Sequence, residues 1–190
     1  MSVLKVNEIQ HTNGTTALTL DTNGNIVENN FELSWWHKTD NTETISSVTT
    51  IDDWTEVSDG HGFKRIGGAF TESSGVFTFP RTGVYKVDGT WAYNKEDPSR
   101  YVGAYIQFTN NNGTSYENLT LYDDLNDSGS DGVYSNLKMT RYVNITNTGT
   151  HKVRFQFESA AAVDLRGGYS NTGVGRWCCT GYCRLYSSRW

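Results

Sequence analysis

The acidic segment between Tyr122 and Gly132 is the first candidate for chemistry in this chain. It reads YDDLNDSGSDG, and carboxylate and carbonyl oxygens in such a loop suit Ca²⁺. When Asp127 is aligned with the first position of an EF-hand loop, Gly129 falls at a ligand position and Lys138 stands where the bidentate glutamate belongs. The segment therefore predicts a solvated surface turn, with calcium binding as the open alternative.

A second candidate is the group of carboxylates around Trp54. Asp52, Asp53 and Glu56 stand close to this indole in the sequence, and paired carboxylates are what glycan cleavage requires. A glycan depolymerase is therefore one hypothesis, although the spacing of such a pair is set in space and not along the chain. Neither a G-x-S-x-G nucleophile elbow nor a phosphate-binding G-x-x-x-x-G-K loop occurs. We expect that the protein is not an enzyme.

The cysteines and histidines do not form a metal-ligand pattern. Cys178, Cys179 and Cys183 have no second cysteine pair and no neighbouring histidine to complete four zinc ligands, and the four histidines lie far apart. Alternation along a strand would put Cys179 and Cys183 on one face as small buried apolar side chains. We expect neither a metal nor a cofactor.

Composition narrows the fold class and the partners. The 190 residues include 13% aromatics and 19 glycines but only 2 prolines, which favours pleated strands joined by tight turns. The net charge of −5, with no basic stripe, argues against nucleic-acid binding. No apolar run reaches the roughly 20 residues of a membrane span, so membrane insertion is not expected. The N-terminus lacks a cationic start followed by an apolar stretch, which predicts synthesis in a cytoplasm.

Period-two alternation identifies the strands. Residues 84–93, 101–108, 150–158 and 175–186 each place apolar side chains on one side and polar side chains on the other, as half-buried antiparallel strands do. Trp35 and Trp36 are adjacent, so a strand would direct them to opposite faces. Strands that recur every ten to fifteen residues predict an all-β sandwich or jelly roll over residues 31–190.

Residues 1–30 differ from the rest of the chain. Short apolar stretches separated by Asn13-Gly14 and Asn23-Gly24 predict small strands with tight turns, and they are too few to close a core alone. Such a segment is either frayed or completed by copies of itself from other subunits, and we expect the second, because its apolar residues are placed regularly.

Two stretches resemble the C1q/TNF-like jelly rolls. Residues 75–87 follow the pattern G-x-F-x-F-P-x-x-G-x-Y-x-V, and residues 180–186 resemble the closing strand of that family. The resemblance covers residues 40–190 and implies a jelly roll that assembles as a homotrimer through aromatic, apolar faces. The candidates for core or trimer-interface positions are the aromatic residues Phe77, Phe79, Tyr85, Trp91, Phe155, Phe157, Trp177 and Tyr182.

The first 26 residues are similar to the N-terminal segment of tail-fibre and other virion proteins of tailed bacteriophages, through LKVNEIQ and the following GTTALTLD and GNI. This resemblance implies a virion structural protein that is anchored to other virion proteins through residues 1–30. The anchoring candidates that it implies are the apolar residues of this segment: Leu4, Val6, Ile9, Leu18 and Leu20. Two roles stay open: a fibre tip that binds a host surface glycan or receptor, and a decoration or cement protein of the capsid. Receptor contacts are expected in loops rich in Tyr, Asn and Gly, at Tyr93, Tyr101, Asn111, Tyr116 and Tyr122.

Overall fold

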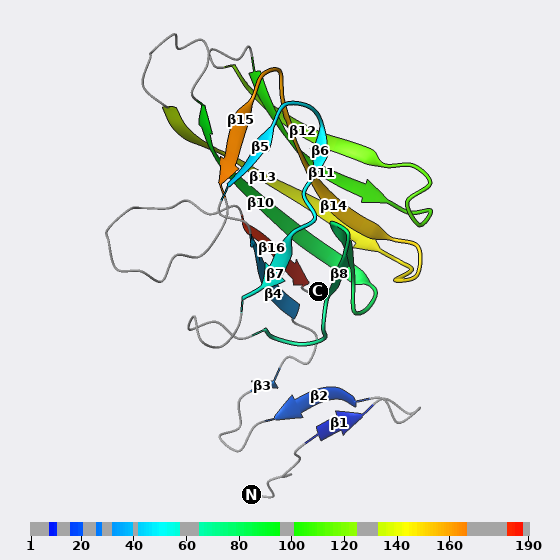
Figure 1. Ribbon diagram of the computed structural model, residues 1–190. Helices are drawn as coiled ribbons and strands as arrows, with labels where there is room; N and C mark the ends of the chain where they lie inside the picture. The colour runs from blue at the N-terminus through cyan, green and yellow to red at the C-terminus, as the bar shows by residue number, and fades with distance from the viewer. Residues whose placement is uncertain are drawn as a thin grey trace, which may run out of the picture.

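The computed structural model of the chain is built from antiparallel strands. It describes residues 8–10, 16–20, 26–27, 32–39, 42–57, 65–95, 101–124, 133–166 and 182–187, and this part of the chain contains no helix. The strands form two larger sheets and one small sheet (Figure 1). The predicted all-β class is therefore confirmed.

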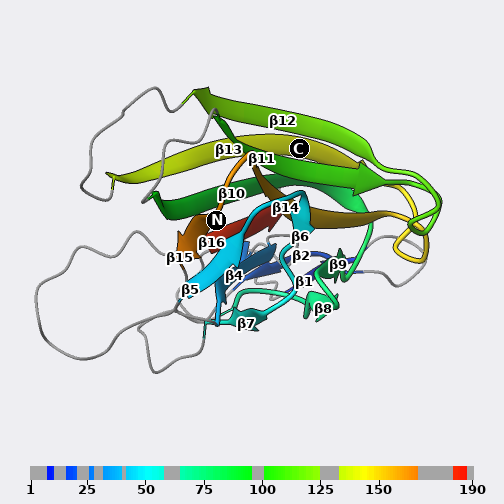
Figure 2. The same cartoon turned by 45° about the horizontal axis from the view of Figure 1, so that its top comes forward.

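The larger sheet is organised around one long strand, β10 (Gly83–Lys95). β13 (Val133–Ile145) pairs with β10 along its whole length, from Gly83↔Ile145 to Lys95↔Val133, and the two strands run side by side in Figure 2. The opposite side of β10 is shared by two strands in succession. The remaining strands of this sheet are β4 (Glu32–Lys38), β5 (Thr42–Ile45), β7 (Trp54–Glu56), β15 (Val163–Arg166) and β16 (Tyr182–Ser187), in the order β5-β15-β10-β16-β4-β7.

The smaller sheet has the order β12-β11-β14-β9-β8, and β6 also pairs with β14. Its strands are β6 (Thr49–Thr50), β8 (Thr71–Ser73), β9 (Val76–Thr78), β11 (Tyr101–Thr109), β12 (Glu117–Asp124) and β14 (Lys152–Ser159). The β11–β12 and β13–β14 turns lie at the same end of the sandwich, where Asn112 N donates a hydrogen bond to Thr150 O at 2.9 Å (Figure 1). Two different hairpins are thus tied together at one end.

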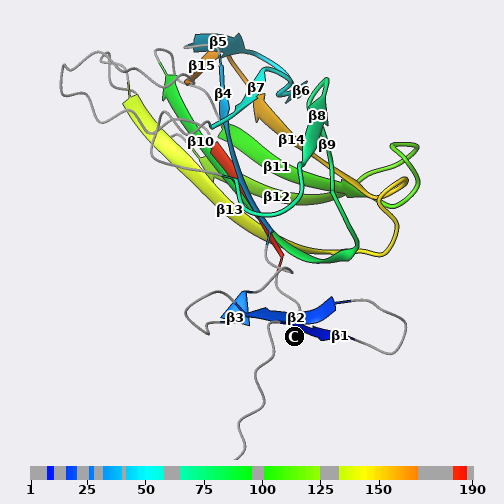
Figure 3. The same cartoon turned by 90° about the horizontal axis from the view of Figure 1, so that it is seen from below.

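The N-terminal strands form a small sheet of their own, which Figure 3 shows from below. β1 (Glu8–Gln10) pairs with β2 (Thr16–Leu20), and β2 pairs with β3 (Ile26–Val27). The sequence prediction of short strands in residues 1–30 is confirmed for these stretches. Whether residues 1–30 and 31–190 behave as separate units stays a prediction.

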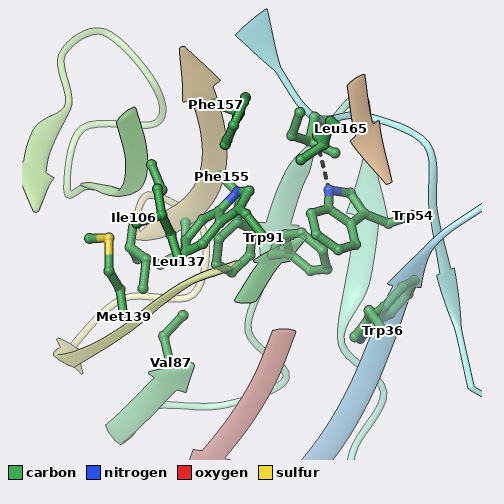
Figure 4. Packing of buried hydrophobic residues seen from close by; sticks show 14 of the residues in the cluster. Trp36, Trp54, Val87, Trp91, Ile106, Leu137, Met139, Phe155, Phe157 and Leu165 are labelled. Carbon is green, nitrogen blue, oxygen red and sulfur yellow. Dashed lines mark hydrogen bonds between the residues drawn. The ribbon is translucent and has the colours of Figure 1, made fainter. Parts of the chain in front are cut away.

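The core lies between the two larger sheets and is rich in aromatic rings. Phe77 of β9 contacts the Phe155 ring edge-on, with 5.5 Å between centroids, and also contacts Trp36 and Trp54. Trp91 of β10 lies against Phe155 from the facing sheet, with 6.0 Å between centroids (Figure 4). Edge-to-face contacts of this kind add to the burial of apolar area and hold the two sheets in one relative position.

Gly89 in the middle of β10 has a packing reason. A Cβ atom at this position would lie 2.4 Å from the Trp91 ring, so the indole folds back over the backbone of its own strand. A glycine in a central strand weakens it because no side chain packs there. The Trp91 ring fills that gap, and both residues are therefore required together.

Candidate interaction surfaces

The outward face of the larger sheet carries exposed apolar side chains. Along β10 the residues Tyr85, Val87 and Trp91 are buried in the core, so the alternate residues beginning with Val84 face outward. Val84 is 49% exposed and Tyr142 of β13 is 69% exposed. We name this surface the large-sheet face, and its described side chains include Leu33, Trp35, Ile66, Val84, Lys86, Asp88, Thr140 and Tyr142.

The strand register aligns part of the large-sheet face into one row. Tyr142 stands opposite Lys86, Lys86 opposite Tyr186, and Tyr186 opposite Leu33. Ile66 continues the row, because Leu33 and Ile66 exchange two backbone hydrogen bonds of 3.0 Å. At the usual spacing of neighbouring strands, five positions span about 19 Å. Backbone positions from five parts of the sequence are thus aligned across one sheet.

Charged groups at the centre of the large-sheet face neutralise one another. Lys86 Nζ donates to Asp88 Oδ2 at 2.8 Å, and Thr140 Oγ1 donates to Asp88 Oδ1 at 2.5 Å. Trp35 lies half-buried on this face while Trp36 points to the core, as their adjacency predicted. The exposed apolar side chains of this face, with the Lys86–Asp88 pair beside them, are suited to contact another protein.

A second group of exposed apolar side chains lies at the edge of the smaller sheet. β12 is the last strand in the sheet order. Leu119 and Leu121 stand opposite Ile106 and Ala104, which are fully buried, yet the two leucines are 38% and 37% exposed. An edge strand with exposed apolar residues is a site for association unless something covers it.

The outward face of the smaller sheet is polar and aromatic instead. We name it the small-sheet face, and it is formed by Tyr101, Tyr105, Gln107, Tyr116, Asn118, Arg154, Gln156 and Glu158. Glu158 accepts hydrogen bonds from the hydroxyls of both Tyr101 and Tyr105. Arg154 Nε donates to Gln107 Oε1 at 2.5 Å, and its guanidinium lies 3.8 Å from the Tyr116 ring centroid. Gln107 Nε2 in turn donates to Asn118 Oδ1 at 2.6 Å.

The turn between β11 and β12 is built around Asn111. Its Oδ1 accepts hydrogen bonds from Thr109 Oγ1 at 2.7 Å and from Ser115 N at 3.0 Å, while its Nδ2 donates to Ser115 Oγ. The next residues, Asn112 and Gly113, both have positive φ, which Asn and Gly tolerate best. The Asn111 side chain therefore shapes the turn from within.

Buried polar groups line the core-facing side of β4. Glu32 is 1% exposed and is paired with Arg81. Trp36 Nε1 donates to Ser34 Oγ at 2.7 Å, and Ser34 Oγ donates to Glu56 Oε1 at 2.6 Å. Charged side chains are rarely buried unless they are paired, so this strand is held by specific partners and not by apolar area alone.

The carboxylates considered for glycan cleavage have separate partners. Glu56 binds Ser34 and Arg65, the latter at 2.8 Å, whereas Asp53 binds Lys38 at 2.5 Å. Asp52 is exposed. Two of the three carboxylates thus already neutralise a cation, which removes the support that their spacing gave to a depolymerase.

Neither a metal centre nor a membrane span is found in the described ranges. There, no three His, Cys, Asp or Glu side chains are grouped to hold a metal ion. Within the same ranges no helix is long and apolar enough to cross a membrane. The acidic segment around Asp127 lies outside the described residues, so its calcium alternative stays open.

The structure places most of the predicted core or interface residues inside the chain. Phe77, Phe79, Tyr85, Trp91, Phe155 and Phe157 lie between the two sheets and are at most 2% exposed. Trp177 lies outside the described residues. The backbone of Tyr182 belongs to β16, between Thr90 and His37. Of the anchoring candidates, Ile9 lies in β1 and Leu18 and Leu20 lie in β2, while Leu4 and Val6 fall outside the described ranges.

Three of the predicted receptor-loop residues are not in loops. The prediction that Tyr93 lies in a surface loop is wrong. Tyr93 belongs to β10 and is 1% exposed, and its ring lies against Phe157 with 5.8 Å between ring centroids. Tyr101 begins β11, and Tyr122 lies in β12 opposite Gly103. Each of these tyrosines is next to a segment rich in turn-forming residues, and the sequence prediction therefore placed them in loops although the strands include them. Asn111 and Tyr116 do lie in the β11–β12 turn.

Comparison with known proteins identifies the fold. The structure of murine APRIL at pH 8.0 aligns with a TM-score of 0.56 and 10% identity over 83% of this chain and 99% of that one. The Eiger TNF structure from S. frugiperda aligns with a TM-score of 0.60 and 13% identity over 84% and 94% of the two chains. No protein-family model matches the sequence, and no curated protein matches it. The chain has a TNF-like jelly-roll fold, as its sequence motif predicted.

Proposed function

We propose that this chain is a structural protein of a tailed-bacteriophage virion and forms the trimeric tip of a tail fibre or accessory fibre. The observation that carries the proposal is the pair of separate apolar surfaces: the large-sheet face with Val84 and Tyr142, and the β12 edge with Leu119 and Leu121. The phage assignment rests on the resemblance of the first 26 residues to tail-fibre proteins.

Two different surfaces on one chain favour a ring. A contact between unlike surfaces is heterologous, and it closes into a ring when the rotation between copies is right. In the proposed trimer the large-sheet face of one copy covers the β12 edge of the next, so that each copy uses both surfaces once. The trimeric C1q/TNF-like jelly rolls support three as the number of copies.

The small-sheet face is the proposed site for a host glycan or receptor. Tyr101 and Tyr116 are partly exposed and are held in place by Glu158 and Arg154, and the exposed Asn118 is held by Gln107, so a ligand would meet side chains that are already ordered. Rigid tyrosines give contact area at a low entropic cost. Three copies on one trimer could raise avidity by roughly 10² to 10⁴ without new contacts.

Electron microscopy of intact particles tests this assignment. Gold-labelled antibody raised against residues 40–190 should mark the tail or the fibre ends. Labelling spread over the head would overturn the fibre role in favour of a capsid decoration or cement protein. Particles without label, from a lysate that contains the protein, would contradict a virion role altogether.

A further inference from the structure

Lys38, at the end of β4, is a buried amine between two carboxylates. Its side chain is 1% exposed, and its Nζ lies 2.5 Å from Asp53 Oδ2 and 3.1 Å from Glu43 Oε2. The two carboxylates are 20% and 34% exposed. One amine, one adjacent carboxyl group and a second carboxyl group thus converge from three parts of the chain.

Strand pairing holds these groups together. Lys38 stands opposite Trp54 in the β4–β7 register, and Asp53 is the residue just before Trp54. Thr39 N donates to Asp53 O at 2.7 Å, which fixes the Asp53 backbone beside the end of β4. Glu43 is held in β5 opposite Leu165 of β15. Reacting groups that are fixed at contact distance behave as if present at very high concentration.

The Lys38–Asp53 pair lies at the border of the apolar core. Trp54, which shares the core-facing side of the sheet with Lys38, is buried, and so is Ile45, two residues beyond Glu43 on β5. Transfer of one proton along the Lys38–Asp53 hydrogen bond produces a neutral amine and a neutral carboxylic acid, and a neutral amine is a nucleophile.

We propose that Lys38 and Asp53 become joined by an isopeptide bond formed by the protein itself. The Lys38 nitrogen attacks Asp53 Cγ, a C–N bond forms, and the C–O bond to the acid hydroxyl breaks. Glu43 accepts a proton from the attacking nitrogen and returns it to the departing hydroxyl, which leaves as water. The condensation involves neither oxidation nor reduction. The exposed part of Asp53 gives the water a route to solvent.

Such a bond would staple the larger sheet. It would join residues separated by 15 positions, across the turn that leads from β4 through β5 to β7. A crosslink of this kind restricts the unfolded chain much as a disulfide does, without dependence on redox conditions. Its loss is expected to lower Tm by about 5 to 10 °C in a chain of this size.

Intact mass of the full-length protein after denaturation is the decisive measurement. A bonded chain is lighter than its sequence by one water molecule, and digestion after glutamate releases residues 33–43 and 44–56 as one linked pair. A mass equal to that of the sequence, with the two peptides separate, would overturn the proposal. The bond survives denaturation, so folding of the sample during the measurement does not matter.

Matched variants separate this bond from other losses of water. Lys38→Arg keeps a cation but removes the nucleophile, so the missing water should return. A water lost as a succinimide at Asp59-Gly60 or Asp131-Gly132 would remain missing in that variant and would count against the bond. Glu43→Gln should leave the chain unbonded or only slowly bonded. Glu117→Gln, at a carboxylate that is 74% exposed and paired with Arg141, should leave the bond intact.

Discussion

The outward faces of the two larger sheets both contact solvent, but their side chains are arranged in different ways. On the small-sheet face the polar side chains bind one another, and Gln107 in its middle is only 5% exposed although it points away from the core. On the large-sheet face the apolar side chains Val84 and Tyr142 stay exposed. A face whose groups satisfy one another can meet water, whereas a face with exposed apolar area gains free energy when another protein covers it.

The difference follows from which residues neighbour each central strand. β11 lies between β12 and β14, whose outward residues are long and polar enough to reach across it, as Arg154 reaches both Gln107 and Tyr116. β10 and β13 carry Val84 and Tyr142 beside Asn144 and Lys86, and the side chains of Val84 and Tyr142 stay exposed. The outward faces of the two sheets therefore differ in chemical character although both sheets follow the same alternating pattern.

Removal of an aromatic ring from the core should destabilise both sheets at once. Phe155→Ala empties the contact with Phe77, Trp54 and Trp91 and should reduce the free energy of unfolding by about 3 to 5 kcal/mol. Chemical denaturation followed by tryptophan fluorescence measures the change. A loss below about 1 kcal/mol would show that the facing sheets are not packed as described.

Charge placed on the large-sheet face should abolish self-association and spare the fold. Tyr142→Asp puts an unpaired charge where a partner is proposed to sit, and a central interface residue of this kind is worth about 2 kcal/mol or more. Light scattering should show a monomer. Thermal unfolding should show an unchanged Tm for the isolated subunit.

The matched control for Tyr142→Asp is Asn118→Asp on the small-sheet face, which should remain a trimer. Wild-type protein that scatters only as a 21.3 kDa monomer would contradict the role assigned to the large-sheet face.

Disruption of the small-sheet network should lower stability moderately and leave association unchanged. Arg154→Ala removes the hydrogen bond to Gln107 and the contact with the Tyr116 ring, which together are worth about 1 to 2 kcal/mol. Thermal unfolding measures the loss, and light scattering checks the oligomer. A variant that dissociates would mean that this face, and not the other, is the interface.

Removal of the exposed ion pair on the large-sheet face should have the smallest effect on the monomer. Lys86→Ala breaks a pair whose side chains are 39% and 18% exposed, so it should change stability by less than about 1 kcal/mol. If the face is covered in a trimer, the same change should weaken association, because Asp88 would then be buried without its cation. If Lys86→Ala lowered the stability of the wild-type trimer and of a Tyr142→Asp monomer by the same amount, that result would argue that the large-sheet face is not covered in the trimer.

The local sequence pattern predicted much of the fold. The alternation of Val153, Phe155 and Phe157, and the motif over residues 75–87, predicted strands that the structure forms, because side-chain direction in a strand depends only on position along the chain. The same alternation already placed Tyr93 on the core side with Trp91, and its assignment to a receptor loop failed because loop composition was given more weight.

The local sequence pattern could not predict which residues become neighbours on adjacent strands. Tyr142, Lys86, Leu33 and Ile66 share one row only because of strand register, and Asp53 reaches Lys38 only because β7 pairs with β4. In the sequence Asp53 looked like half of a catalytic carboxylate pair, whereas the structure makes it the partner of a buried lysine. Alternation decides which side of a strand a residue occupies, but only long-range pairing decides which residues it meets there.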